Sequence, residues 1–223
     1  SLKSVADLGR AHSILVVHDL GSGLVVPTAE LLGHQEASVQ QSVRDGASLT
    51  CFSADKMLGG PQAGVIVGKF DEIDRLKKNP LFRTIRADKI IFALLEQTAG
   101  AYLDGRWKND ILLWRLAATP VEQLRSRAEA IIAQAGSPTG VTAVSSEAFM
   151  GGGSLPDQPL ASVAIRFDRA RDARKLIRKF RELNPPVIGR IAGDAFFLDL
   201  KAIDPSEDQL LSAAIAAVVS QLE

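Results

Sequence analysis

Lys56 is the residue whose type and position point most directly to chemistry. It lies three residues after Ser53, where the short apolar run Ala47–Ser53 ends, and a glycine-rich turn beginning at Gly59 follows it. Burying an ammonium group is costly, so a lysine next to a buried strand has either a lowered pKa or a charged partner. An amine made less basic in this way suits Schiff-base chemistry. The alternative, favoured by the two residues taken alone, is a surface lysine paired with its neighbour Asp55.

Two further residues could complete a pyridoxal phosphate site around Lys56. This cofactor needs a lysine for its aldehyde, an acid that keeps its ring nitrogen protonated, and hydroxyl or amide groups for its phosphate. Asp19 ends the apolar run Ser13–Leu20, and Ser53 ends the run before Lys56. Adjacent parallel strands present such ends at the same edge of a sheet, where ligands bind in open α/β folds. We therefore expect Asp19, Ser53 and Lys56 to lie close to one another at such an edge.

A pair of arginines offers a candidate anion site. Arg83 and Arg86 are three residues apart at the start of an expected helix, so they would share one helix face and could hold an anion between them. Without further information, a solvated pair is the simpler interpretation. The expected helix Asp168–Leu183 is also densely basic, and we interpret most of its charges as a solvated face, with contact to nucleic-acid phosphates as the alternative.

The elements that must position these residues form an α/β pattern. Buried strands are predicted at three apolar runs: Ser13–Leu20, Ala47–Ser53 and Ala63–Lys69. A polar, helix-like stretch separates the first two, so the order strand, helix, strand, turn, strand indicates part of an α/β sheet covered by helices. Two longer helices are expected at Phe82–Leu103 and Pro120–Ala135.

The last part of the sequence predicts a small α+β domain. After the turn-like string "GSPTG", about four short strands alternate with two helices, the second at Pro205–Leu222. We therefore expect three parts. They are a partial large α/β domain at 1–105, a connecting helical segment at 106–137 and a small C-terminal α+β domain at 138–223.

Composition excludes several classes of protein. The chain is 46% hydrophobic and 23% charged, which suits one large or two small globular domains. No apolar run approaches the ~20 residues of a membrane span, and the start lacks a signal-peptide pattern, so we expect a cytoplasmic protein. The single cysteine excludes an internal disulfide framework, and no Cys/His cluster has the spacing of a zinc site. A net charge of zero argues against a surface generally coated by nucleic acid.

Ser53 and Lys56 also match the S-x-x-K pattern of penicillin-recognising enzymes, but the S-D-N and K-T-G strings that accompany it do not occur.

The wording of several segments resembles a known family, bacterial selenocysteine synthase, the L-seryl-tRNA(Sec) selenium transferases. The string "FSADKMLGGPQAGVIVGK" at Phe52–Lys69 is similar to the lysine segment of that family, with Ala54 and Met57 as mild departures. Three other segments occur in the same order with similar spacing: "DLGSG" at Asp19–Gly23, "NPLFRTIRADK" at Asn79–Lys89 and "GGGSLP" at Gly151–Pro156. The resemblance therefore covers nearly the whole chain.

The resemblance implies a role for each candidate residue. The family is a fold-type-I pyridoxal phosphate enzyme of roughly twice this length, and the similarity maps to its second half. Lys56 would bind the cofactor aldehyde, Asp19 would pair with the pyridine nitrogen, and Ser53 would lie near the phosphate. Asp55 would assist proton movement beside Lys56, and the arginines at 83 and 86 would bind a selenophosphate-type anion.

The implied reaction is a β-replacement on serine esterified to tRNA(Sec), in which water leaves and selenium from selenophosphate is added. The resemblance also implies a homo-oligomer, at least a dimer. Because the family's N-terminal half is absent, we expect this chain alone to be inactive. Two alternatives stay open: another pyridoxal phosphate lyase acting on a small amino acid or amino sugar phosphate, and an inactive oligomerisation fragment.

Overall fold

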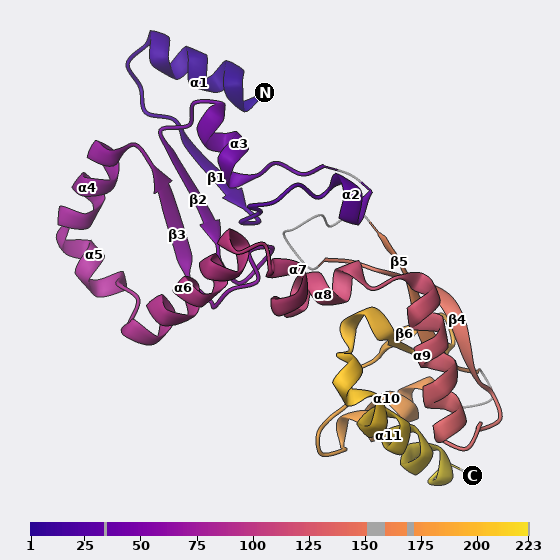
Figure 1. Cartoon of the computed structure of the whole chain (residues 1–223). Helices are drawn as coiled ribbons and strands as arrows, with labels where there is room; N and C mark the ends of the chain where they lie inside the picture. Colours follow the sequence, from indigo (N-terminus) through magenta and orange to yellow (C-terminus); the bar gives the residue numbers. More distant parts are fainter. Residues whose placement is uncertain (34, 151–158, 169–171, 223) are drawn as a thin grey trace. The chain divides into compact units, whose positions relative to one another are not determined.

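The computed structural model describes residues 1–33, 35–150, 159–168 and 172–222 of the chain. It forms two compact units, the first built mainly from Ser1–Arg115 and the second mainly from Leu116–Phe149 and residues 159–222 (Figure 1). The segment Gly151–Pro156, one of the four that carry the family resemblance, lies outside the described residues. The domain division expected at 105 and 137 stays a prediction.

The first unit is built on a three-stranded sheet. Its strands, in spatial order, are β1 (Val17–Gly21), β2 (Leu49–Ser53) and β3 (Gly64–Gly68). β1 and β2 run parallel, and their arrowheads point the same way in Figure 1; β3 returns antiparallel to β2 after the turn that carries Lys56. Two short helices, α2 (Ala29–Leu32) and α3 (Val39–Arg44), connect β1 to β2. This is the expected order of strand, helix, strand, turn, strand.

Burial matches the sequence prediction only for the middle strand. Leu49 and Phe52 of β2 are 9% and 8% exposed, as expected for a buried strand. The prediction was wrong for β1, which begins only at Val17, a residue that is 59% exposed. It was also wrong for β3, where half-buried and exposed residues alternate. Both are outer strands of the three-stranded sheet, and no segment of the described ranges covers the exposed side chains.

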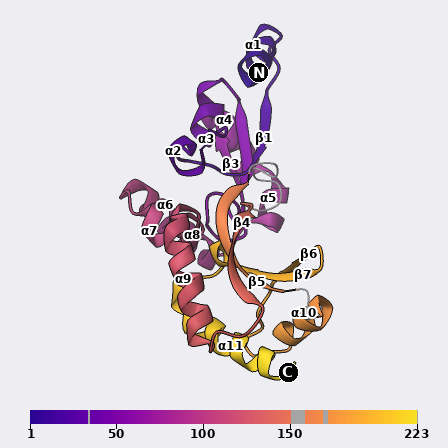
Figure 2. The ribbon, with the colours of Figure 1, turned by 90° about the vertical axis from the view of Figure 1, so that its right-hand side faces the viewer.

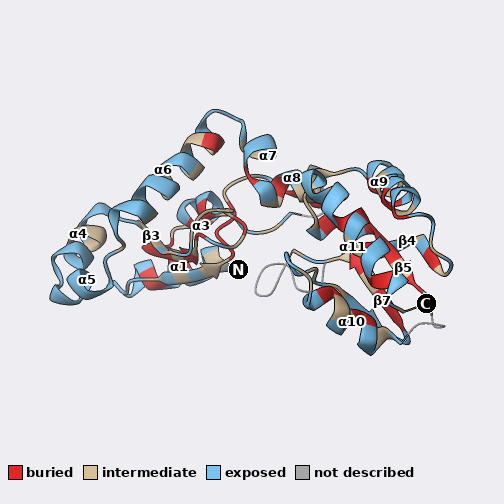
Figure 3. Cartoon of the chain, turned by 90° about the horizontal axis from the view of Figure 1, so that it is seen from below, coloured by how far each residue is buried: buried red, intermediate tan, exposed pale blue. Residues whose placement is uncertain are grey.

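Helices also precede and follow this sheet along the chain. α1 precedes it and five helices follow it: α1 (Leu2–Ala11), α4 (Phe70–Lys78), α5 (Pro80–Ile85), α6 (Lys89–Leu103), α7 (Trp107–Asp110) and α8 (Leu112–Ala118). Figure 3 shows that α4, α5 and most of α6 are largely exposed. The single helix expected from Phe82 to Leu103 was wrong, because the backbone is extended at Arg86. Asp88 then starts α6 by accepting hydrogen bonds from two free amides of its first turn, at 2.9 and 3.0 Å.

The second unit is the small α+β arrangement that the sequence predicted. Its four-stranded sheet is antiparallel throughout, in the order β4 (Val141–Ala148), β5 (Leu160–Phe167), β7 (Ala195–Asp199) and β6 (Arg190–Ala192). Its helices are α9 (Val121–Gln134), α10 (Ala173–Arg181) and α11 (Asp208–Ser220), with short 3₁₀ turns η1 (Leu200–Ala202) and η2 (Pro205–Glu207) (Figure 2). α9 realises the predicted helix Pro120–Ala135, with Pro120 as its N-cap.

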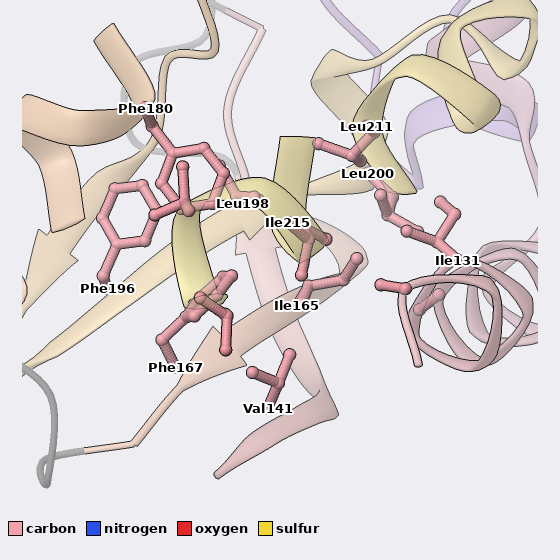
Figure 4. Close-up of a cluster of buried hydrophobic side chains, with 14 of the residues drawn as sticks. Ile131, Val141, Ile165, Phe167, Phe180, Phe196, Leu198, Leu200, Leu211 and Ile215 are labelled. Atoms are coloured by element: carbon pink, nitrogen blue, oxygen red, sulfur yellow. The ribbon is translucent and has the colours of Figure 1, made fainter. Parts of the chain in front are cut away.

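A continuous apolar core holds the second unit together. Figure 4 shows aromatic side chains of the sheet and α10 meeting aliphatic side chains of α9 and α11. Phe167, Phe180 and Phe196 are fully buried and lie with ring centroids 5.2–5.5 Å apart. At the edge of this core Arg127 of α9 makes two hydrogen bonds to Asp208 of α11, at 2.7 and 3.0 Å. This charged pair fixes one helix to the other.

Two kinds of feature are missing from the part of the chain that the structure describes. Within it no helix has the length and apolarity needed to cross a membrane. Nor does it contain a group of three or more His, Cys, Asp or Glu side chains that could hold a metal ion.

Candidate functional site

Lys56 lies on a tight turn directly after β2. The turn is closed by its own backbone: Gly59 N donates to the Lys56 carbonyl at 2.9 Å, and Gly60 N donates to the Ala54 carbonyl at 2.8 Å. Ala54 N also donates to the Ala63 carbonyl, at 2.8 Å, which joins the turn to the start of β3. Lys56 itself is half-buried.

The end of β1 lies beside this amine. A Cβ added at Gly21 would come within 3.8 Å of Lys56 Nζ, so the end of β1 and the amine are close neighbours. Gly21 also has a φ of +69°, a conformation that favours glycine. The loop after β1 is tied to the lysine turn by a hydrogen bond from Met57 N to the Ser22 carbonyl, at 2.9 Å. The parallel strands thus bring "DLGSG" and the lysine turn together, as the sequence predicted.

Asp19 lies on β1, two residues before Gly21 and opposite Cys51 of β2. Its side chain is exposed, which leaves the carboxylate available to a ligand. The pKa of the Cys51 thiol is raised, mainly by burial and secondarily by the negative charge of Asp19. The carboxylate therefore acts electrostatically on the strand that leads to Lys56. Its neighbour His18 is bound elsewhere, with Nδ1 2.9 Å from Ser42 Oγ.

Asp55 and Ser53 flank the lysine but do not neutralise it. In the described residues no carboxylate lies within 4.0 Å of Lys56 Nζ, so the surface ion pair with Asp55 that the sequence alone favoured is not formed. Asp55 is exposed and Ser53 is half-buried at the end of β2. The four residues Asp19, Ser53, Asp55 and Lys56 thus belong to one end of the parallel strand pair.

The two arginines are arranged differently from the expectation. Arg83 lies in α5, whereas Arg86 is the residue after it, with φ −62° and ψ 126° in extended conformation. The argument that they share one face of a continuous helix was therefore wrong, because α5 ends at Ile85 and Asp88 begins a new helix. Both arginines are exposed. Their role as an anion site stays a prediction.

Sequence reasoning missed the side chain that holds the lysine turn from α6. Tyr102 Oη donates to the Leu58 carbonyl at 2.8 Å and lies 3.4 Å from the Met57 carbonyl. Trp114 Nε1 in turn donates to Tyr102 Oη at 2.7 Å. Tyr102 lies 44 residues beyond Leu58, so no local pattern could pair the two. The available signal was that it is the chain's one tyrosine, on a helix with an apolar stripe.

The donor set fits pyridoxal phosphate. The Lys56 amine lies beside Gly21, where a Cβ would come within 3.8 Å of it, and the same two strands carry a carboxylate at Asp19 and a hydroxyl at Ser53. These are the three kinds of group that the aldehyde, the ring nitrogen and the phosphate require.

The fold is shared with a solved enzyme structure. That of D-glucosaminate-6-phosphate ammonia-lyase matches 100% of this chain and 53% of its own, with a TM-score of 0.65 at 16% sequence identity. The similarity shows the fold alone. It confirms the expected α/β fold, which this chain shares with about half of that enzyme.

The family follows from the sequence comparisons. The family model for L-seryl-tRNA selenium transferase (SelA) matches residues 1–204, so the chain belongs to this family. An L-seryl-tRNA(Sec) selenium transferase of Geotalea daltonii is 39% identical over 98% of this chain and 49% of its own length. One of Maridesulfovibrio salexigens is 35% identical over 96% of this chain and 48% of its own length. The chain thus spans about half the length of the curated relatives it matches, and the family predicted from the sequence is confirmed.

Proposed function

We propose that this chain is the lysine-bearing half of a pyridoxal phosphate-dependent L-seryl-tRNA(Sec) selenium transferase, which converts seryl-tRNA(Sec) to selenocysteinyl-tRNA(Sec) with selenophosphate. One observation carries the proposal: the Lys56 amine is held at the end of two parallel strands, beside Gly21, with no carboxylate within 4.0 Å in the described residues. The proposed substrate, seryl-tRNA(Sec), is taken from the names of the relatives. The proposed use of pyridoxal phosphate is supported by the residues of the site.

Three residues would hold the cofactor. Lys56 Nζ would bind the aldehyde, the Asp19 carboxylate would keep the ring nitrogen protonated, and Ser53 Oγ would donate to the phosphate. When bound, pyridoxal phosphate supplies an electron sink for the loss of a substituent from the β-carbon of serine.

The remaining work of the site is proton transfer. Lys56 Nζ can take a proton from the substrate and return one, which is the task of a general acid–base residue. The exposed Asp55 carboxylate, next in sequence, would assist proton movement beside the lysine.

Partners follow from the same proposal. Arg83 and Arg86, both exposed, would bind the selenophosphate anion from α5 and from the extended residue that follows it, rather than from one helix face. The complete enzyme would bind seryl-tRNA(Sec), act as a homo-oligomer and work in the cytoplasm.

Transfer of selenium from labelled selenophosphate to seryl-tRNA(Sec) tests the proposal. It should be measured in the longer protein of which we propose this chain is a part. Lys56→Ala should lower the rate by at least about 100-fold, whereas Lys69→Ala, an exposed lysine at the end of the same sequence motif, should leave it unchanged. Arg83→Ala should raise KM for selenophosphate and leave KM for the tRNA unchanged. Full activity of Lys56→Ala would contradict the proposal.

A further inference from the structure

Tyr102 is placed to hold the backbone next to Lys56. Its hydroxyl has a single proton, which it donates to the Leu58 carbonyl at 2.8 Å, two residues after the lysine. Trp114 Nε1 donates to the same oxygen at 2.7 Å, and the Trp114 side chain is fully buried. Tyr102 Oη therefore accepts a hydrogen bond from a buried indole and donates its own proton to the lysine turn.

The rest of this contact is equally well packed. Trp107 stacks on Tyr102, with centroids 6.0 Å apart and planes 20° from parallel, and meets Trp114 edge-on at 5.4 Å. A Cβ at Gly59 of the turn would come within 2.3 Å of Ile111 Cγ2. The turn thus lies against the segment from α6 to α8, and a shift of the Leu58 carbonyl has little room.

The hydroxyl remains a donor under ordinary conditions. Burial raises the pKa of Tyr102 to about 12, although the hydrogen bond from Trp114 lowers it somewhat. The phenol is therefore neutral at any pH at which the protein would work.

We propose that Tyr102, oriented by Trp114, is a positioning residue that fixes the turn carrying Lys56 and so aims the lysine amine at its ligand. It touches neither substrate nor cofactor in this role. That Tyr102 holds the turn is argued from the hydrogen bonds and ring contacts described above. That it thereby aims the Lys56 amine at a cofactor rests on the proposed function.

Amide hydrogen exchange on this chain tests the loop-holding part directly. Tyr102→Phe keeps the ring and removes only the hydroxyl, so exchange at the Met57, Gly59 and Gly60 amides should become about fivefold faster, the effect of one lost hydrogen bond. Ser38→Ala is the matched control, because Ser38 Oγ accepts from Gln41 N at 3.1 Å and caps α3 in the same unit. It should leave those three amides unchanged. Equal exchange in wild type and Tyr102→Phe would overturn the inference.

A second measurement does not depend on the folding of a variant. Tyr102 is the chain's one tyrosine, so growth on 3-fluorotyrosine changes that position alone. Fluorine makes the phenol a stronger donor, and exchange at the same amides should slow. Unchanged or faster exchange would count against the inference.

The consequence for the amine is read by trapping pyridoxal phosphate with borohydride and mapping the labelled lysines. Tyr102→Phe should lower labelling at Lys56 about fivefold relative to Lys69, and Ser38→Ala should not. If exchange increases while labelling at Lys56 is unchanged, Tyr102 is merely structural and the positioning role is refuted. If the wild-type chain and the longer protein both show no label at Lys56, the proposed function fails instead, and the exchange result still decides what Tyr102 holds.

Discussion

The ion pair between Arg127 and Asp208 should be a main determinant of the stability of the second unit. The two side chains are 10% and 26% exposed, and they meet through two hydrogen bonds, at 2.7 and 3.0 Å. A third bond joins Arg127 Nη2 to the Ile203 carbonyl at 3.1 Å. Asp208→Ala would leave a nearly buried guanidinium without its carboxylate. That change costs about 3 kcal/mol, at the lower end of the range for buried pairs because Asp208 is partly exposed.

Urea denaturation followed by far-ultraviolet circular dichroism measures this cost. With a slope of about 1.5 kcal/mol per M, the midpoint for the second unit should fall by about 2 M. All of the chain's tyrosine and tryptophan lies in Ser1–Arg115, so intrinsic fluorescence reports on the first unit by itself. The fluorescence transition should not move.

Two variants make the test strict. Glu182→Ala breaks two exposed contacts of 3.6 and 3.7 Å in the same unit, and should cost less than about 0.5 kcal/mol. Arg127→Met combined with Asp208→Leu should recover most of the loss, because an apolar pair replaces the buried charges. A cost below about 1 kcal/mol for Asp208→Ala would refute the reasoning, since it would place the pair among ordinary surface ion pairs.

Four further predictions concern single residues. Lys201→Met should destabilise the second unit by about 2 kcal/mol in urea, because the 9% exposed lysine donates to two carbonyls at the end of α8, at 2.9 and 3.1 Å. Burial lowers the pKa of Lys201 below its ordinary value of 10.5, so the unfolded chain binds more protons between the two values, and wild-type stability should rise with pH there; Lys201→Met should lack this slope. Asp19→Asn should speed alkylation of Cys51 at pH 8, because removing the carboxylate lowers the pKa of a thiol that burial and Asp19 both raise; an unchanged rate would contradict their proximity. Gly59→Ala should lower the free energy of unfolding of the first unit, followed by fluorescence, by about 1 kcal/mol more than Gly105→Ala: both have a φ of +71°, but only at position 59 would the methyl meet a side-chain carbon, 2.3 Å away.

The sequence predicted the arrangement that brings the candidate site together. A parallel pair of strands that carry Asp19 and Ser53 followed from two apolar runs separated by a helix, and local patterns sufficed because each run is short and bounded by turn residues. The strands and helices of the small α+β part were predicted for the same reason, whereas the antiparallel order of its sheet was not predicted. What the patterns overestimated was burial, because an apolar run does not reveal whether another segment covers it. Val17 shows this, with 59% of its surface exposed.

Other parts of the site depended on contacts that no local pattern encodes. Asp88, the N-cap of α6, indicates the break between α5 and α6. We predicted one continuous helix instead because the apolar residues on both sides of Asp88 follow a helical spacing. The contact of Tyr102 with the lysine turn joins segments 44 residues apart through a side chain and a carbonyl, so only the folded chain reveals it. The periodicity of apolar residues predicts helices and strands, whereas the hydrogen bonds between these elements form only when the chain packs into its tertiary structure.

Borohydride reduction after incubation with pyridoxal phosphate, followed by peptide mapping, tests the central claim most directly. It should be done on this chain and on the longer protein of which we propose it is a part. The account predicts a pyridoxyl group on Lys56 in the longer protein, and its presence in this chain as well would show that the ends of β1 and β2 suffice to hold the cofactor. A label on other lysines with none on Lys56, in both proteins, would contradict the account.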